Sequence, residues 1–103
     1  MAVVFLAPTA LDNLARLIES HSLPADTRDR LRRSLRPLVD FPLLGSPLDG
    51  RWSGFRFVLG PWRWMIVVYA FDEEPDRVVF VTIQDARSAR AATTATGTGP
   101  EPA

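Results

Sequence analysis

Three arginines in the second half of the sequence could together bind an anion of the size of a phosphate group. They are Arg56, Arg63 and Arg87; the first two fall in strand-like segments and the third follows the last such segment. A guanidinium group pairs with phosphate through two parallel hydrogen bonds and keeps its charge when it is partly buried. Held on one small sheet, the three side chains would form a shared anion site. The simpler alternative for Arg63 is that it is solvated or paired with a carboxylate such as Asp72 or Asp49.

Composition limits the kinds of site that the chain can build. The 103 residues predict one domain and contain no cysteine, which excludes disulfides, thiolate metal ligands and a cysteine nucleophile. No apolar run reaches the length of a transmembrane helix, so we expect a cytoplasmic protein with no membrane partner. The net charge is zero, yet all twelve basic residues are arginine, and eight of them lie between residues 28 and 63 against three acids. We expect no metal and no cofactor, because the sequence holds no metal-ligand set and no glycine-rich phosphate loop.

The hydrophobic pattern of the first forty residues predicts one strand and two helices. Residues 2–6 are apolar and β-branched, as in a strand, and residues 8–20 have the apolar spacing of an amphipathic helix that begins at Pro8. A second helix begins near residue 26 and should end or kink at Pro37, because proline disrupts a helix interior. The two helices are therefore expected to form an antiparallel hairpin.

The remaining sequence predicts a loop and then a sheet. Residues 40–50 are rich in proline and glycine, and strand-like segments follow at 51–59, 62–71 and 78–83. Alternation in the middle segment puts Arg63 and Tyr69 on the same face. Residues from 85 onward are expected to leave the sheet.

This order of elements predicts an α+β fold with a single domain over residues 1–90. The fold would consist of an N-terminal strand, a helical hairpin packed on one face of the sheet, and a three-stranded antiparallel meander. Residues 91–103 are small, polar and marked by proline and glycine, which predicts a disordered C-terminal tail.

Four short patterns, in this order, are similar to those of a known family of toxins. The loop run Phe41-Pro42-Leu43-Leu44-Gly45 precedes Leu48 and Gly50, and the three arginines stand in Gly54-Phe55-Arg56-Phe57, Gly60-Pro61-Trp62-Arg63 and Gln84-Asp85-Ala86-Arg87. From the first strand to residue 90, the chain resembles the RelE/ParE superfamily of type II toxin–antitoxin toxins. The resemblance matches the three arginines to basic residues of the family's site.

The resemblance implies a small bacterial toxin that is neutralised by a cognate antitoxin encoded beside it. In the RelE branch, the toxin is an endoribonuclease that cuts messenger RNA in the ribosomal A site. The ParE branch instead poisons DNA gyrase and has no known catalytic residues. A third alternative is a degenerate member that is no longer toxic and only binds a partner. Because one fold carries such different functions, the residues of the site must decide between them.

Three departures from the family pattern count against the nuclease alternative. Ile66 stands where the family usually has an aromatic residue, three positions after the strand arginine. No aromatic residue follows Arg90, although RelE-type nucleases carry a tyrosine near the C-terminus. The additional lysines of the RelE cleft have no equivalent here beyond Arg56.

Cleavage of RNA by its own 2′-hydroxyl requires more than arginine can supply. The reaction needs a base for that hydroxyl, stabilisation of charge at the phosphorus and an acid for the leaving oxygen. Arginine performs the second task and not the proton transfers, because its pKa lies above about 12. Tyr69 and Asp85 are the remaining candidates for moving a proton, since the only histidine, His21, is expected at a helix end away from the sheet. The catalytic set expected for a nuclease is therefore Arg56, Arg63 and Arg87 with Tyr69.

Other features have two interpretations each. The second helix carries a row of arginines that could be a solvated face or could attract ribosomal RNA or an acidic antitoxin. The three tryptophans could stack on bases, although in so small a domain they are more often core anchors; they are Trp52, Trp62 and Trp64. An antitoxin segment is expected to cover the domain as an added strand or as a helix in a groove.

Overall fold

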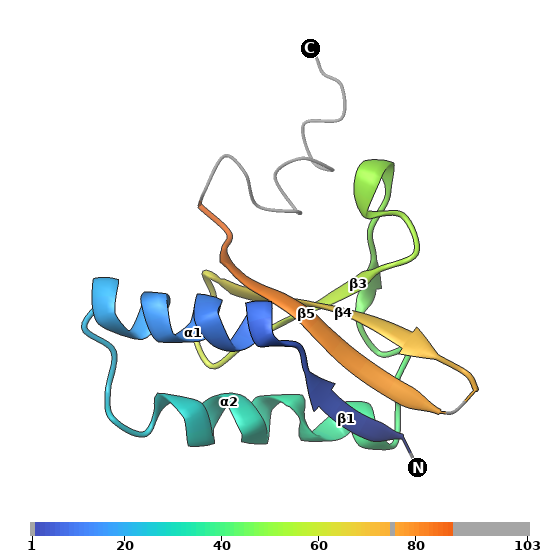
Figure 1. Ribbon diagram of the computed structural model, residues 1–103, viewed down its shortest axis with the longest axis horizontal. Helices are drawn as coiled ribbons and strands as arrows, with labels where there is room; N and C mark the ends of the chain where they lie inside the picture. Colours follow the sequence, from blue (N-terminus) through green and yellow to red (C-terminus); the bar gives the residue numbers. More distant parts are fainter. Residues whose placement is uncertain (1, 75, 88–103) are drawn as a thin grey trace.

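The strands form one mixed sheet in which β5 lies between β1 and β4. The computed structural model describes residues 2–74 and 76–87, and the strand order across the sheet is β1-β5-β4-β3-β2. The strands are β1 Val3–Leu6, β2 Ser46–Pro47, β3 Arg56–Leu59, β4 Met65–Asp72 and β5 Arg77–Asp85. β1 runs parallel to β5, and the other neighbouring pairs are antiparallel (Figure 1). The predicted meander is therefore confirmed as β3, β4 and β5.

Two helices follow β1, as the sequence predicts. They are α1 (Pro8–Ser20) and α2 (Thr27–Leu35), and Figure 1 shows the loop that joins them. Pro8 occupies the first turn of α1, where the N–H that proline lacks would have no helical partner. Pro37 lies in the 3-10 helix η1 (Arg36–Val39), into which α2 passes at its C-terminal end. The predicted helical hairpin and the α+β class are both confirmed.

The main core lies between the helices and one face of the sheet. It contains Met65, Val67 and Tyr69 of β4, which alternate along the strand, together with Leu14 of α1 and Leu31 of α2. All five side chains are almost completely buried. The side of α2 that carries Leu31 and Leu35 therefore faces the sheet.

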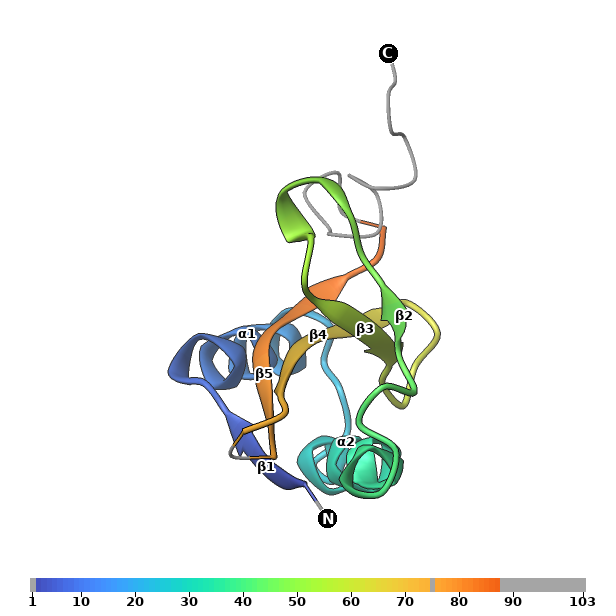
Figure 2. The ribbon, with the colours of Figure 1, turned by 90° about the vertical axis from the view of Figure 1, so that its right-hand side faces the viewer.

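A smaller apolar group covers part of the opposite face. Val68 of β4 packs there against Leu48, and the partly buried Trp52 and Phe57 extend the contact. These residues bring in the segment between η1 and β3, whose 3-10 turn η2 (Gly50–Trp52) projects from the sheet in Figure 2.

Three predicted boundaries in the sheet region were wrong. The strand expected over 62–71 begins at Met65, because residues 60–64 form a turn in which the N–H of Gly60 donates to the carbonyl of Met65. The loop expected over 40–50 contains the short strand β2. The strand expected over 51–59 is reduced to β3, because Gly54 adopts a positive φ of 94° and turns the chain.

The predicted tail over 91–103, together with residues 88–90, lies outside the described residues. Within the part of the chain that the structure describes, neither helix has the length and apolar character needed to cross a membrane. No group of side chains there is arranged to hold a metal ion.

Candidate functional site

Tyr69 lies inside the core, where its hydroxyl group holds the loop that precedes β2. The hydroxyl donates to the carbonyl of Pro42 at 2.8 Å and accepts the N–H of Gly45 at 2.9 Å. Burial raises the pKa of Tyr69 above its ordinary value, although the bond from Gly45 and the charge of Arg56 oppose this shift. The side chain is fully buried, so its hydroxyl does not face a substrate at the surface. This geometry favours a structural role for Tyr69 over the catalytic one expected from the sequence.

Arg56 holds the same loop from the neighbouring strand. Its Nη1 donates to the carbonyls of Gly45 at 2.7 Å and Leu43 at 3.3 Å. Arg56 of β3 pairs with Tyr69 of β4, and Asp85 at the end of β5 pairs with Met65 of β4. Tyr69 and Met65 are four residues apart along β4. At about 3.3 Å per residue, Arg56 lies about 13 Å from that end. The three arginines therefore do not meet at one point.

Arg63 and Arg87 lie at the same end of the sheet. Arg63 is exposed in the turn before β4, and not on the strand as expected, and it makes no ion pair or hydrogen bond with another described residue. The backbone N–H of Ala86 donates to the carbonyl of Trp64 at 2.6 Å, which fixes the segment of Arg87 beside that of Arg63. The structure thus places two of the three predicted arginines on neighbouring segments at one end of the sheet.

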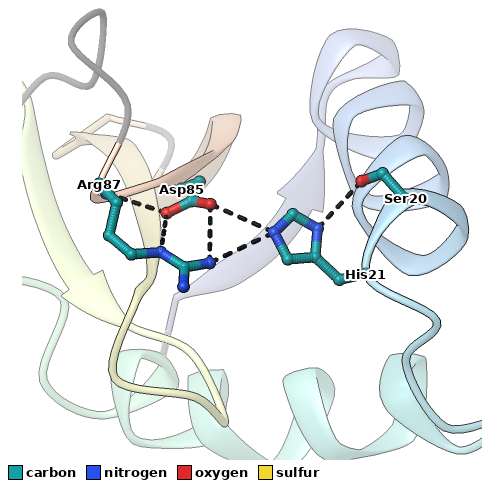
Figure 3. A network of polar contacts seen from close by, with 4 residues as sticks. All are labelled: Ser20, His21, Asp85 and Arg87. Carbon is teal, nitrogen blue, oxygen red and sulfur yellow. Dashed lines mark hydrogen bonds and ion pairs between the residues drawn. The ribbon is translucent and has the colours of Figure 1, made fainter.

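Asp85 binds Arg87 through both carboxylate oxygens. Nε and Nη2 of Arg87 donate to Oδ1 and Oδ2 of Asp85, each at 2.9 Å, and the backbone N–H of Arg87 also donates to Oδ1 (Figure 3). The hydrogen bonds from Arg87 lower the pKa of Asp85 to about 2, against an opposing effect of partial burial. The same bonds raise the pKa of Arg87. Asp85 is therefore a carboxylate at any physiological pH.

His21 lies against this pair, which corrects the expectation that it stands away from the sheet. Its Nε2 is 3.2 Å from Oδ2 of Asp85 and 3.3 Å from Nη2 of Arg87. Its ring stacks on Trp64 with the ring centres 4.5 Å apart and the planes inclined by 14°. Cζ of Arg87 lies 5.1 Å from the same indole. Because the histidine and guanidinium nitrogens are in contact, both groups cover the same face of Trp64.

Stacked side chains continue from this point to α2. The ring centres of Trp62 and Trp64 are 6.4 Å apart, and Cζ of Arg30 lies 6.0 Å from the ring of Trp62. We call Arg30, Trp62, Trp64 and Arg87 the arginine–tryptophan ladder. Arg63 lies between its two tryptophans in the chain and adds a positive charge that is unpaired among the described residues. Guanidinium groups next to aromatic rings suit a nucleic-acid backbone and its bases.

Sequence reasoning missed the contribution of His21 and did not connect the tryptophans to the arginines. His21 is separated from Asp85 by 64 positions, and no local spacing relates them. The one sequence signal for a role of His21 was that it is the only histidine and stands at the end of the first helix. The sequence indicates Asp85 as a candidate for moving a proton, and the structure places it in contact with His21 and Arg87.

Comparison with known proteins finds similarity in structure only. No model of a known family matches the sequence, and no curated protein sequence matches it. The fold is similar to the isolated RelE toxin of E. coli, with a TM-score of 0.62 at 16% identity over 87% of this chain and 89% of the other. It is similar to YafQ of E. coli, with a TM-score of 0.61 at 13% identity over 88% and 100%. The toxin–antitoxin complex RelBE2 of Mycobacterium tuberculosis contains a chain 24% identical, with a TM-score of 0.50 over 82% and 90%.

These likenesses extend over nearly the whole described chain and include the order of its helices and strands. The fold expected from the sequence resemblance is therefore confirmed, whereas the residues of the site remain to be tested. By its architecture, the chain has the fold of the RelE-type toxins.

Proposed function

We propose that this chain is the toxin of a type II toxin–antitoxin system and that it cleaves messenger RNA at the ribosome. The single observation that carries the proposal is the arginine–tryptophan ladder, beside which Arg63 stands unpaired among the described residues. The fold, which this chain has in common with the RelE toxin of E. coli, supports the same conclusion.

The ladder suits single-stranded RNA for two physical reasons. Guanidinium groups neutralise backbone phosphates, and the partly exposed indole edges offer contacts to bases that do not depend on sequence. A shallow polar depression of about 420 Å³ lies beside the ladder, lined in part by Arg30, Arg33 and Pro61. RNA could therefore extend from Arg87 across the turn before β4 toward α2.

Arg63 is the residue to change first. We expect Arg63→Ala to abolish growth arrest on induced expression and to slow the cleavage of messenger RNA on purified ribosomes. Arg51→Ala is the matched control, since Arg51 is also exposed and unpaired among the described residues but lies in η2. Binding of a single-stranded RNA oligonucleotide should lose about one unit of salt slope with Arg63→Ala and none with the control.

Equal toxicity of Arg63→Ala and the wild-type chain would contradict the role given to this surface. Inhibition of DNA supercoiling by the purified protein, without RNA cleavage, would favour a gyrase inhibitor instead. Normal growth under strong expression of the wild-type chain would contradict the toxin proposal as a whole.

The groove between the helices and β1 is the place that suits the proposed antitoxin. An apolar groove of about 330 Å³ lies between β1, α1 and α2, lined by Leu11 and Leu35 among others. Three arginines stand along it at intervals of four residues, Arg28 and Arg32 of α2 and Arg36 of η1. Arg28 and Arg36 make no ion pair with other described residues. An amphipathic segment with acidic residues would satisfy both the groove and its charges.

The antitoxin proposal is tested separately from RNA cleavage. We expect the chain to co-purify with the product of the neighbouring reading frame and to lose toxicity when the two are expressed together. A stable monomer that binds no such product would contradict this part of the proposal.

A further inference from the structure

The only histidine of the chain lies where RNA cleavage would require a proton-transfer group. We propose that His21, oriented by Asp85, is the general base that removes the proton from the 2′-hydroxyl of the RNA. This inference rests on the function proposed above and adds a general base, a task that the arginines cannot perform. It rests on the contacts of His21 with α1, with the turn before β4 and with the end of β5.

The contacts of the imidazole define its orientation. Nε2 faces Oδ2 of Asp85 at 3.2 Å, and Nδ1 faces the hydroxyl of Ser20 at 2.9 Å. Nε2 meets one acceptor, Oδ2 of Asp85, and one donor, Nη2 of Arg87 at 3.3 Å, so we adopt the tautomer in which Nε2–H donates to the carboxylate and Nδ1 keeps its lone pair. Stacking on Trp64 holds the plane of the ring. Asp85 and Arg87 are the charged groups in contact with it.

Ser20 marks the position that a substrate hydroxyl would take. In the tautomer adopted above, its hydroxyl donates to Nδ1 at a distance suited to proton transfer, and the serine itself is exposed at the end of α1. A ribose 2′-hydroxyl that displaced Ser20 would make the same hydrogen bond. The neighbouring guanidinium of Arg87, with its side chain 63% exposed, could then contact the phosphate that follows the ribose.

The cleavage step balances with these groups. The 2′-oxygen forms a bond to phosphorus and its proton passes to Nδ1 of His21, while the bond from phosphorus to the 5′-oxygen breaks. Arg87 stabilises the charge on the phosphorane oxygens. The leaving 5′-oxygen takes a proton from water, and the imidazolium returns its proton to solvent. The products are a 2′,3′-cyclic phosphate and a 5′-hydroxyl end.

His21 has a simpler structural interpretation, in which it only ties the end of α1 to β5. Three substitutions separate the two roles. His21→Phe keeps a ring to stack on Trp64, His21→Gln keeps a polar group near Asp85, and His21→Gly leaves a space that added imidazole can fill. A structural role would tolerate at least one of the first two, whereas a general base is lost in all three.

The experiment measures cleavage of messenger RNA on ribosomes by the full chain and by each variant, with RNA binding and thermal unfolding measured in parallel. We expect each variant to cleave at least about 100-fold more slowly, while RNA binding changes little. Added imidazole should restore part of the activity of His21→Gly. Arg51→Ala, the control already used for Arg63, lies in η2 and should cleave within about threefold of the wild type.

Cleavage by His21→Phe or His21→Gln within about threefold of the wild-type rate would overturn the inference. If these variants do not fold, lack of rescue of His21→Gly by imidazole would overturn it instead. Loss of activity in Arg63→Ala alone, with all His21 variants active, would leave the proposed function standing without the histidine. Absence of cleavage by the wild-type chain would remove both.

Discussion

Tyr69→Phe tests whether the hydroxyl of Tyr69 stabilises the fold or takes part in catalysis. The substitution removes one hydroxyl and keeps the ring, which packs against Phe80 at a distance of 5.9 Å between ring centres. The N–H of Gly45 then loses its partner in a buried position, at a cost of about 1–3 kcal/mol. The carbonyl of Pro42 is only partly buried and adds about 0.5–1.5 kcal/mol. We therefore expect the free energy of unfolding to fall by about 2–3 kcal/mol.

Urea denaturation and thermal unfolding would measure this loss. For a domain of this size, it corresponds to a decrease in Tm of at least about 8 °C. Thr82→Val is a matched control, because Thr82 makes one hydroxyl bond to Asn13, whose oxygen also accepts the N–H of Ile83. The control should lose about 0.5–1.5 kcal/mol. Below its melting temperature, Tyr69→Phe should cleave RNA like the wild type, since its hydroxyl is buried.

Two results would refute this reasoning. If Tyr69→Phe unfolds within about 0.5 kcal/mol of the wild-type chain, the hydroxyl does not hold the loop in the way described. If the variant is stable but no longer cleaves RNA, Tyr69 takes part in the chemistry, as the sequence alone suggested.

Three further predictions concern the remaining parts of the molecule. Asp85→Asn should lower the free energy of unfolding at pH 7 by about 1–2 kcal/mol. The pKa of Asp85 falls from 3.8 to about 2 on folding, so its carboxylate stabilises the fold above about pH 4, and this contribution is lost as the pH falls through 2. Unfolding curves at pH 7 and at about pH 2 should therefore show that the difference in free energy of unfolding between Asp85→Asn and the wild type narrows at the lower pH. Gly45→Ala should cost about 1–3 kcal/mol in denaturation experiments, because its added Cβ would lie 2.7 Å from the carbonyl oxygen of Phe57; unchanged stability would contradict that packing. Arg28→Glu together with Arg36→Glu should weaken antitoxin binding at least about tenfold in calorimetry while leaving RNA cleavage intact, and unchanged affinity would place the antitoxin elsewhere.

Local patterns were sufficient to predict the elements that depend on near neighbours in the chain. The helix from Pro8 to Ser20 follows from its apolar spacing and its initial proline. The alternation of Met65, Val67 and Tyr69 correctly identified one face of β4. These features are decided within a few residues, which is the range over which sequence periodicity carries information.

The site was predicted less completely than the fold. Whether its arginines meet depends on which end of the sheet each one occupies, and local periodicity does not decide this. Arg56 and Arg63 stand close in sequence, yet the turn over residues 60–64 places them at different parts of the sheet. The guanidinium of Arg56 is used by loop carbonyls, a contact that only the path of the preceding loop creates.

The contact between His21 and Asp85 could not be predicted from spacing at all. It requires that α1 end beside the far end of β5, which is a consequence of packing rather than of any local pattern. The aromatic ring of Trp64 completes this arrangement from a third element. A site assembled from three distant segments becomes visible only when the fold is known.

The central place of β5 has a consequence for synthesis of the chain. β1 has no other strand to pair with, and β4 would have a bare edge until β5 is added. Because a polypeptide emerges from the ribosome in order, the sheet can close only after the segment up to Asp85 has been translated. Asp85 and Arg87 belong to the same late segment. A nascent chain therefore carries the proposed RNA-binding surface in an unassembled state until translation has passed Arg87.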